Sequence, residues 1–143
     1  LMGSDKDMPK MESAMAVLDS FEIEHEVHVM SAHRTPEKVA SFAQAARANS
    51  FGVIICGAGK AAHLAGAVAA HSTLPIIGVP ISAGGLGGVD ALYSTVQMPT
   101  GIPVATVAID SAANAAYLAA SILSISDPAI ADRLDGYREG LKR

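Results

Sequence analysis

The chain has 143 residues, half of them hydrophobic, and a formal net charge of −4. This length suits one domain with a substantial core and is short for two, so we expect residues 1–143 to form a single domain. The Lys and Arg residues are scattered, whereas a nucleic-acid surface requires a concentrated basic face. Apolar runs such as Val53–Cys56 are broken long before the roughly 20 residues of a membrane span, so neither nucleic acid nor membrane is an expected partner.

The cysteine and histidine content indicates neither a disulfide nor a metal centre. Cys56 is the single cysteine, and the sequence shows no basic-then-apolar leader, so we expect a cytoplasmic protein. Because Cys56 ends an apolar run, we interpret it as a packing residue. No histidine lies in a cluster of Cys or carboxylate residues with the spacing of metal ligands, so no metal is expected.

Short apolar or β-branched runs alternate with longer segments typical of helices. In chain order, the sequence predicts a strand end at 1–4, a helix at Lys10–Phe21, a strand at His25–Met30, a helix at Lys38–Asn49, a strand at Val53–Cys56, a helix at Ala61–Ala70, a strand at Ile76–Val79, a helix at Gly88–Thr95, a strand at Val104–Ile109, and helices at Ala112–Ser124 and Pro128–Leu141. This order predicts an α/β fold with a parallel sheet covered by helices. We expect the strand that ends at 1–4 to lack its earlier residues.

Two helix starts carry capping signals. Asp7 precedes Pro9, and Thr35 directly precedes Pro36, so each is predicted to cap the helix that follows it. Both helices are therefore expected to begin just after a polar loop.

Polar and glycine-rich loops follow the predicted strands, at the edge of a parallel sheet where ligands bind. Ser4, Ser31 and Arg34 can supply the donors and the positive charge that a phosphate monoester needs, and Asp7 can accept hydrogen bonds from ribose hydroxyls. The alternative is that Ser4 and Asp7 are only helix caps and Arg34 is a solvated surface cation.

Histidines offer candidates for proton transfer. His33 lies between Ser31 and Arg34, and a neutral imidazole can accept and return a proton at physiological pH. The alternative for His33 is an ordinary surface residue. His63 either lines a pocket or merely begins a helix, and His71 is interpreted as structural.

The segment Gly57-x-Gly59-x-x-Ala62 matches a loose dinucleotide fingerprint, but Val79-Pro80-Ile81-Ser82 stands where the acidic ribose ligand is expected. The sequence pattern of the phosphate-binding loop of nucleotide hydrolases is not matched either, because Lys60 is followed by Ala61 and not by Ser or Thr. The glycines instead allow a ligand to approach the backbone closely.

Several segments together resemble one enzyme family. They are Met-Gly-Ser at 2–4, Ser-Ala-His-Arg-Thr-Pro at 31–36, Gly-Ala-Gly-x-Ala-Ala-His-Leu at 57–64, Leu-Pro-Ile-Ile-Gly-Val-Pro at 74–80 and Val-Gln-Met-Pro-Thr-Gly-Ile-Pro-Val-Ala-Thr at 96–106. Over residues 1–123 this combination closely resembles the bacterial N5-carboxyaminoimidazole ribonucleotide mutases. The resemblance implies a flavodoxin-like three-layer αβα sandwich, an octamer with sites shared between subunits, and no cofactor or metal.

The family converts N5-carboxyaminoimidazole ribonucleotide into 4-carboxy-5-aminoimidazole ribonucleotide in purine biosynthesis. The resemblance implies that His33 transfers the proton. The residues that it assigns to the phosphoribosyl part of the substrate are Ser4, Asp7, Ser31 and Arg34. Those that it assigns to the pocket for the base and the carboxylate are Ala58, Gly59, His63 and Leu64. The implied route is loss of the carboxylate as trapped carbon dioxide, attack on it by ring carbon 4, and removal of that carbon's proton in a closed pocket.

Two alternative functions stay open. A related branch on the same fold carboxylates aminoimidazole ribonucleotide directly with carbon dioxide, but it carries Lys where Arg34 stands and a Gly-Arg-Ser-Asn-type loop in place of 57–60. The other alternative is a non-catalytic module that binds a phosphorylated small molecule. The chain departs from the mutase pattern at Lys6, Lys60 and Ala65, and it has a shorter segment at 110–114 and a truncated C-terminal tail. These departures concern the detail of the loops more than the class of reaction.

The predicted helix at Ala112–Ser124 is unusually rich in alanine. Its smooth surface extends over more than one face, whereas a monomer of this length offers only one sheet for it to pack against. We therefore expect excess apolar surface to be buried against copies of the same chain, in a closed homo-oligomer for which the resemblance implies eight subunits.

Overall fold

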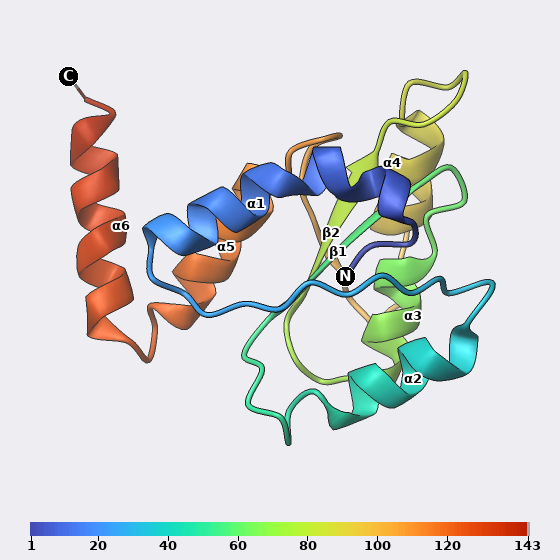
Figure 1. The fold of residues 1–143 in the computed structure, drawn as a ribbon, viewed down its shortest axis with the longest axis horizontal. Helices are drawn as coiled ribbons and strands as arrows, with labels where there is room; N and C mark the ends of the chain where they lie inside the picture. The colour runs from blue at the N-terminus through green and yellow to red at the C-terminus, as the bar shows by residue number, and fades with distance from the viewer. Residues whose placement is uncertain (143) are drawn as a thin grey trace.

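A parallel sheet lies between two layers of helices (Figure 1). The computed structural model describes residues 1–142. Its elements are the 3-10 turn η1 (Asp5–Asp7), α1 (Met8–Ser20), α2 (Pro36–Ala45), β1 (Ile54–Gly59), α3 (Leu64–His71), β2 (Ile76–Ile81), α4 (Val89–Val96), β3 (Ala105–Thr106), α5 (Ala112–Leu123) and α6 (Pro128–Gly140). Every predicted helix is present, with ends that differ from the prediction by a few residues.

The order of the sheet confirms the predicted flavodoxin-like fold. β1 and β2 pair in parallel from Ile54↔Ile76 to Gly59↔Ile81, and β2 pairs with β3 in the same sense. On the other side of β1, Met2 forms parallel bridges with both Gly57 and Val29. The spatial order is therefore the segment around Val29, the segment around Met2, β1, β2 and β3, which is the 2-1-3-4-5 order of flavodoxin-like sheets.

Two predicted strands are shorter than the sequence indicates. His25–Met30 is reduced to the bridge at Val29, because its neighbour is the short segment at 1–3, whose Met2 accepts from Met30 N at 3.0 Å and donates to His28 O at 3.0 Å. Val104–Ile109 is reduced to Ala105–Thr106. Beyond β3 two further bonds reach β2, from Val107 N to Gly78 O at 3.0 Å and from Asp110 N to Pro80 O at 2.9 Å, and the backbone turns at Asp110 with φ of 57°.

The two faces of the sheet carry separate apolar cores. Helices α1 and α5 cover one face and contact Ile77 and Val79, whereas α2 and α3 cover the other and contact Cys56 and Ile76. In Figure 1 the α4 helix lies on the same side as α3. This burial on both faces explains the nearly unbroken apolar runs of β1 and β2. Burial raises the pKa of the Cys56 thiol to about 11, so Cys56 is a protonated packing residue, as predicted.

The alanine-rich helix α5 is already covered within the chain, which contradicts the expectation that it leaves excess apolar surface. Five of its alanines, at 112, 115, 116, 119 and 120, are at most 3% exposed because α1 and the sheet pack against them. Four of the eight exposed large hydrophobic side chains in residues 1–142 lie at α4. Leu86 just before it, and Val89, Tyr93 and Val96 on it, are 44–66% exposed at the three- and four-residue spacing of one helix face.

Within residues 1–142, none of the helices has the length and apolarity needed to cross a membrane.

Candidate functional site

A cleft of about 690 Å³ opens at the carboxyl ends of the strands. Four loops meet there: 3–7 after the Met2 segment, 31–34 after Met30, 58–64 at the end of β1, and 83–84 after β2. Every site residue predicted from the sequence lines this cleft, namely Ser4, Asp7, Ser31, His33, Arg34, Ala58, Gly59, His63 and Leu64. The structure therefore brings together residues that lie up to 60 positions apart in the sequence.

The loops expected at this edge also contribute lining residues that were not assigned individually as site residues. They are Gly3, Lys6, Ala32, Lys60, Ala61, Ala83 and Gly84. The position of Lys60 directly after Gly59 was a usable signal, because the loop at the end of a buried strand faces the ligand edge of the sheet. Ala83 and Gly84 follow β2 and satisfy the same rule.

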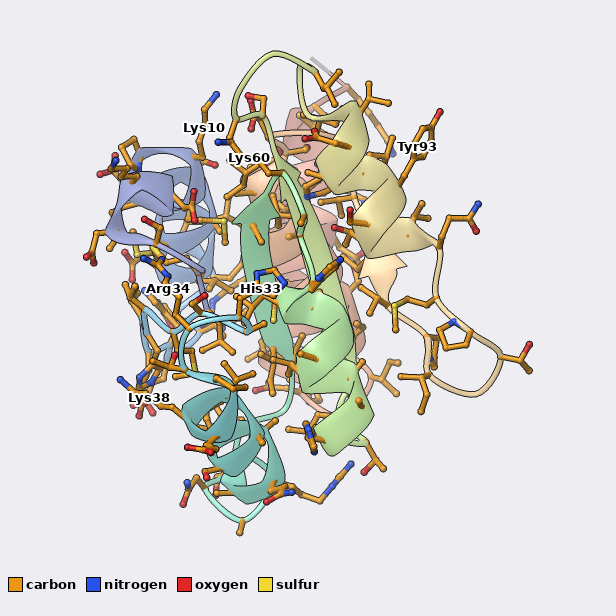
Figure 2. The ribbon with its side chains drawn as sticks, turned by 90° about the vertical axis from the view of Figure 1, so that its right-hand side faces the viewer. Lys10, His33, Arg34, Lys38, Lys60 and Tyr93 are labelled. Carbon is orange, nitrogen blue, oxygen red and sulfur yellow. The ribbon has the colours of Figure 1, made fainter. Side chains whose placement is uncertain are left out.

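Ser4, Asp7, Ser31 and Arg34 form what we call the polar wall of the cleft. Ser31 Oγ accepts hydrogen bonds from His33 N at 3.3 Å and Arg34 N at 3.2 Å, so it closes the turn that presents both side chains. Arg34 Nη2 donates to Gly3 O at 3.2 Å and joins this turn to the first loop. In Figure 2 the two side chains leave this turn in different directions, Arg34 toward the start of α1 and His33 toward the start of α3.

Asp7 and Thr35 occupy the predicted N-cap positions, each followed by a first-turn proline, but the expected side-chain cap bonds are absent. Neither Asp7 nor Thr35 makes a side-chain bond to its helix; Ser4 Oγ caps η1 through Lys6 N at 3.3 Å, and Thr35 Oγ1 accepts from Ser31 N at 3.1 Å. The Asp7 carboxyl is half-buried at the cleft, and this burial raises its pKa above the ordinary value. Because a buried carboxylate needs hydrogen-bond partners and the helix does not supply one to the Asp7 side chain, Asp7 is suited to accept hydrogen bonds from ribose hydroxyls.

Ala58, Gly59, Ala83 and Gly84 form the opposite side, which we call the glycine wall. A Cβ atom on Gly59 would lie 2.9 Å from Ala83 Cβ and 3.1 Å from Ile81 O. Only glycine lets the ends of β1 and β2 approach this closely, and Gly84 adopts a φ of 80° that favours glycine. The wall therefore offers backbone and methyl groups to a ligand.

His33 and His63 form a pair across the cleft. His33 Nε2 lies 2.7 Å from His63 Nδ1, and the rings meet edge to face at 80°. In this contact one nitrogen donates a proton and the other accepts it. If both rings were doubly protonated, two N–H groups would face each other and repel. Both side chains are exposed to the cleft. A pair in this geometry can share one proton between the two rings.

A hydrogen-bonded cluster fastens the glycine wall to α1. Lys10 Nζ donates to Asp110 Oδ2 at 2.7 Å, Ser82 N donates to Asp110 Oδ1 at 2.9 Å, and the Ser82 hydroxyl also bonds to Asp110. Burial acts to raise the pKa of Asp110, but the bonds from Lys10 and Ser82 together outweigh it and hold the pKa below its ordinary value. Because Ser82 precedes Ala83, the cluster fixes where the wall begins.

A larger cavity of about 900 Å³ lies at the opposite, amino end of the sheet, beside residues 72–76 and 101–105. Its lining is mostly apolar, and its single Arg or Lys, Arg47, already donates to Thr73 O at 3.2 Å. The smaller cleft, which gathers more polar and charged side chains, is therefore the better candidate for the functional site. Among residues 1–142, no three His, Cys, Asp or Glu side chains are grouped so that they could hold a metal ion.

Comparison with known proteins gives one consistent family. A family profile described as AIR carboxylase matches residues 1–143. The chain is 54% identical to the N5-carboxyaminoimidazole ribonucleotide mutase of Pyrococcus abyssi over 143 residues, which are 100% of this chain and 82% of that protein. It is 50% identical over 141 residues to the Escherichia coli protein of the same name, covering 97% of this chain and 83% of that one. The chain belongs to the AIR carboxylase family.

A solved structure supports the same assignment. The crystal structure of Treponema denticola PurE superposes with a TM-score of 0.87 at 34% identity and covers 99% of this chain and 88% of that one. The similarity extends over nearly the whole chain and supports the α/β fold with a parallel sheet flanked by helices.

Proposed function

We propose that this chain is an N5-carboxyaminoimidazole ribonucleotide mutase of de novo purine biosynthesis. It moves a carboxylate from the exocyclic nitrogen of aminoimidazole ribonucleotide to ring carbon 4. Curated relatives of that name share about half of its residues over nearly the whole chain. The structural observation that carries the proposal is the convergence of the predicted phosphate, ribose and proton-transfer groups on one cleft.

The polar wall is proposed to hold the phosphoribosyl part of the substrate. Arg34 supplies a fixed positive charge, and Ser4 and Ser31 supply hydroxyl groups beside it. A charge-assisted bond between a guanidinium and a phosphate oxygen is about twice as strong as a neutral one. Asp7 accepts from the ribose hydroxyls, because it is the carboxylate on the same wall.

The proton balance of the reaction fits a residue that both accepts and donates. When the carbon–nitrogen bond breaks, the nitrogen keeps the electron pair and takes up a proton, and carbon dioxide is released. Ring carbon 4 then attacks the carbon dioxide, and its proton leaves to restore the aromatic ring. One proton is taken and one is returned, so His33, oriented by His63 at 2.7 Å, suffices as the shuttle.

The glycine wall is proposed to enclose the base and the carbon dioxide. Ala58 and Gly59 offer little side-chain volume, so a flat imidazole can lie against the backbone. Leu64 is 2% exposed and adds an apolar side chain to the lining of the cleft. Such a wall slows escape of carbon dioxide and limits access of water to the intermediate.

The test is to incubate the protein separately with N5-carboxyaminoimidazole ribonucleotide and with aminoimidazole ribonucleotide plus bicarbonate, and to follow formation of the 4-carboxylated product. The proposal expects turnover of the first substrate and no faster reaction than the uncatalysed background with the second. A direct carboxylase would favour the second, and a binding module would turn over neither. Either result overturns the proposal.

Association with copies of the same chain is also proposed, and the octamer stays a prediction from the resemblance. Its structural support is the exposed stripe of Leu86, Val89, Tyr93 and Val96, since a monomer rarely exposes so contiguous an apolar face. Light scattering at micromolar concentration tests it: a stable particle of monomer mass contradicts the proposal, and Tyr93→Glu is expected to weaken assembly.

Two further expectations stay predictions: that residues 1–143 act as one catalytic domain, and that the protein is cytoplasmic.

A further inference from the structure

Lys60 is a cation of the cleft to which the reaction outlined above gives no role. It lies at the end of β1 directly after Gly59, lines the cleft, and is exposed. Figure 2 shows Lys60 and Arg34 on different sides of His33. The two cations therefore line the cleft from separate loops.

The backbone at Lys60 is held in a conformation that few side chains adopt. Its φ is 55°, in the left-handed region where glycine fits without steric cost and lysine does not. A tight turn fixes this geometry, because Ala62 N donates to Lys60 O at 2.9 Å. Residues kept in such conformations cluster at ligand sites, where the surrounding structure holds them in place.

The side chain of Lys60 extends to the loop after β2. A Cβ atom on Gly84 would lie 3.3 Å from Lys60 Cε, so the lysine stem extends from the β1 loop to the loop after β2. In the part of the chain that the structure describes, the Lys60 ammonium takes part in none of the salt bridges, whereas Lys10 at the same end of the sheet is paired with Asp110. The charge of Lys60 is thus available to a ligand.

The charge of the cleft is opposite to that of the chain. Lys6, Arg34 and Lys60 line it with a single carboxylate, Asp7, although the whole chain carries a formal net charge of −4. The substrate has two anionic ends, a phosphate and a carboxylate, separated by the ribose and the imidazole. Arg34 on the polar wall is assigned to the phosphate, and this leaves the carboxylate without a cation.

We propose that Lys60 is the specificity-determining cation that binds the migrating carboxylate group. The inference rests on the proposed function and on the placement of the base beside Ala58 and Gly59. An ammonium on a flexible stem can remain paired with the carboxylate at nitrogen and at carbon 4, because it has three donors and no fixed plane. The Lys60 ammonium also favours binding of the carboxylated ribonucleotide over the uncarboxylated one.

The experiment compares ligands with and without the carboxylate. The Michaelis constant for 4-carboxy-5-aminoimidazole ribonucleotide, assayed in the reverse direction, is set against the inhibition constant of aminoimidazole ribonucleotide. In Lys60→Met we expect the first to rise by about tenfold to hundredfold, the scale of a lost charge-assisted bond, and the second to change by less than about threefold. Lys38→Met removes one charge of the same kind outside the cleft and is expected to change neither.

Lys60→Gly separates a ligand contact from a structural role. Glycine relieves the left-handed backbone, so the thermal midpoint should be equal to or above that of the natural protein, while the Michaelis constant rises as in Lys60→Met. Equal rises in both constants, or no rise in either, would overturn the assignment of Lys60 to the carboxylate. If the natural protein shows no turnover, the proposed function fails, and calorimetric binding of the two ribonucleotides still decides whether Lys60 distinguishes them.

Discussion

The two walls of the cleft are built by opposite means. The polar wall presents exposed or half-buried polar side chains on loops that hydrogen bonds tie together, as between Arg34 and Gly3. The glycine wall presents backbone, and it exists because Gly59 and Ala83 pack too closely for a larger side chain. Side-chain changes on the first wall should therefore alter binding and turnover, whereas an added methyl group on the second should alter the fold.

The largest effect is expected at His33, which lies between the walls. His33→Asn should lower turnover by about 10² or more, the usual scale for losing a positioned acid–base group, with ligand binding and the far-UV spectrum nearly unchanged. His71→Asn, at the end of α3 and outside the cleft, is the matched control. Near-normal turnover in His33→Asn would remove His33 from the proton-transfer role.

Arg34→Ala tests the polar wall itself. Loss of a charge-assisted contact of about 1.5–3 kcal/mol should raise the Michaelis constant by about tenfold to hundredfold with a smaller change in turnover number. Arg47→Ala removes an equal charge from the cavity at the other end of the sheet and should leave the constant unchanged. If both variants behave alike, Arg34 is an ordinary surface residue.

Gly59→Ala tests the glycine wall. The new methyl group would meet Ala83 Cβ at 2.9 Å and Ile81 O at 3.1 Å, so the ends of β1 and β2 must separate. We expect a loss of about 1–3 kcal/mol in the free energy of unfolding, measured in urea. Gly85→Ala introduces the same methyl group where nothing lies within 4 Å and should stay within about 0.5 kcal/mol. Equal free energies of unfolding for the two variants would mean that the ends of β1 and β2 can separate at little cost.

The smallest effect concerns Asp110, which anchors the glycine wall. Its pKa in the folded protein lies below the ordinary value of 3.8, so its ionised form stabilises the fold above that pH, and the contribution is lost as pH falls through the folded pKa. Asp110→Asn keeps a residue that tolerates positive φ and should cost about 0.5–1.5 kcal/mol at pH 7. Urea unfolding should show this difference shrinking below pH 3.8. A difference that is independent of pH would contradict the ion pair with Lys10.

The sequence predicted the parts of the fold that repeat a pattern. The alternation of apolar runs and helices gave the flanked parallel sheet, and the rule that ligands bind at strand carboxyl ends gathered residues from Ser4 to Leu64 at one cleft. Asp7 and Thr35 carried genuine capping signals, but their side chains are not bonded to the helices that follow. Local signals cannot tell which of two nearby acceptors a backbone N–H will choose.

Contacts between distant residues were beyond the sequence interpretation. The bond from Lys10 to Asp110 joins residues 100 positions apart, and nothing in either local segment predicts it. The burial of the α5 alanines was misjudged for the same reason, since the closeness of α1 depends on both helices at once. The exposed stripe at α4 has helical spacing in the sequence, but its exposure is visible only after the other helices are placed.

A crystal structure with bound 4-carboxy-5-aminoimidazole ribonucleotide tests the division of labour between the walls most directly. We predict the phosphate oxygens within about 3 Å of the Arg34 guanidinium and the Ser4 and Ser31 hydroxyls, and ring carbon 4 beside His33, with the imidazole against Ala58 and Gly59. A phosphate seated on the glycine wall, or a ligand bound in the cavity beside Arg47, would contradict the account.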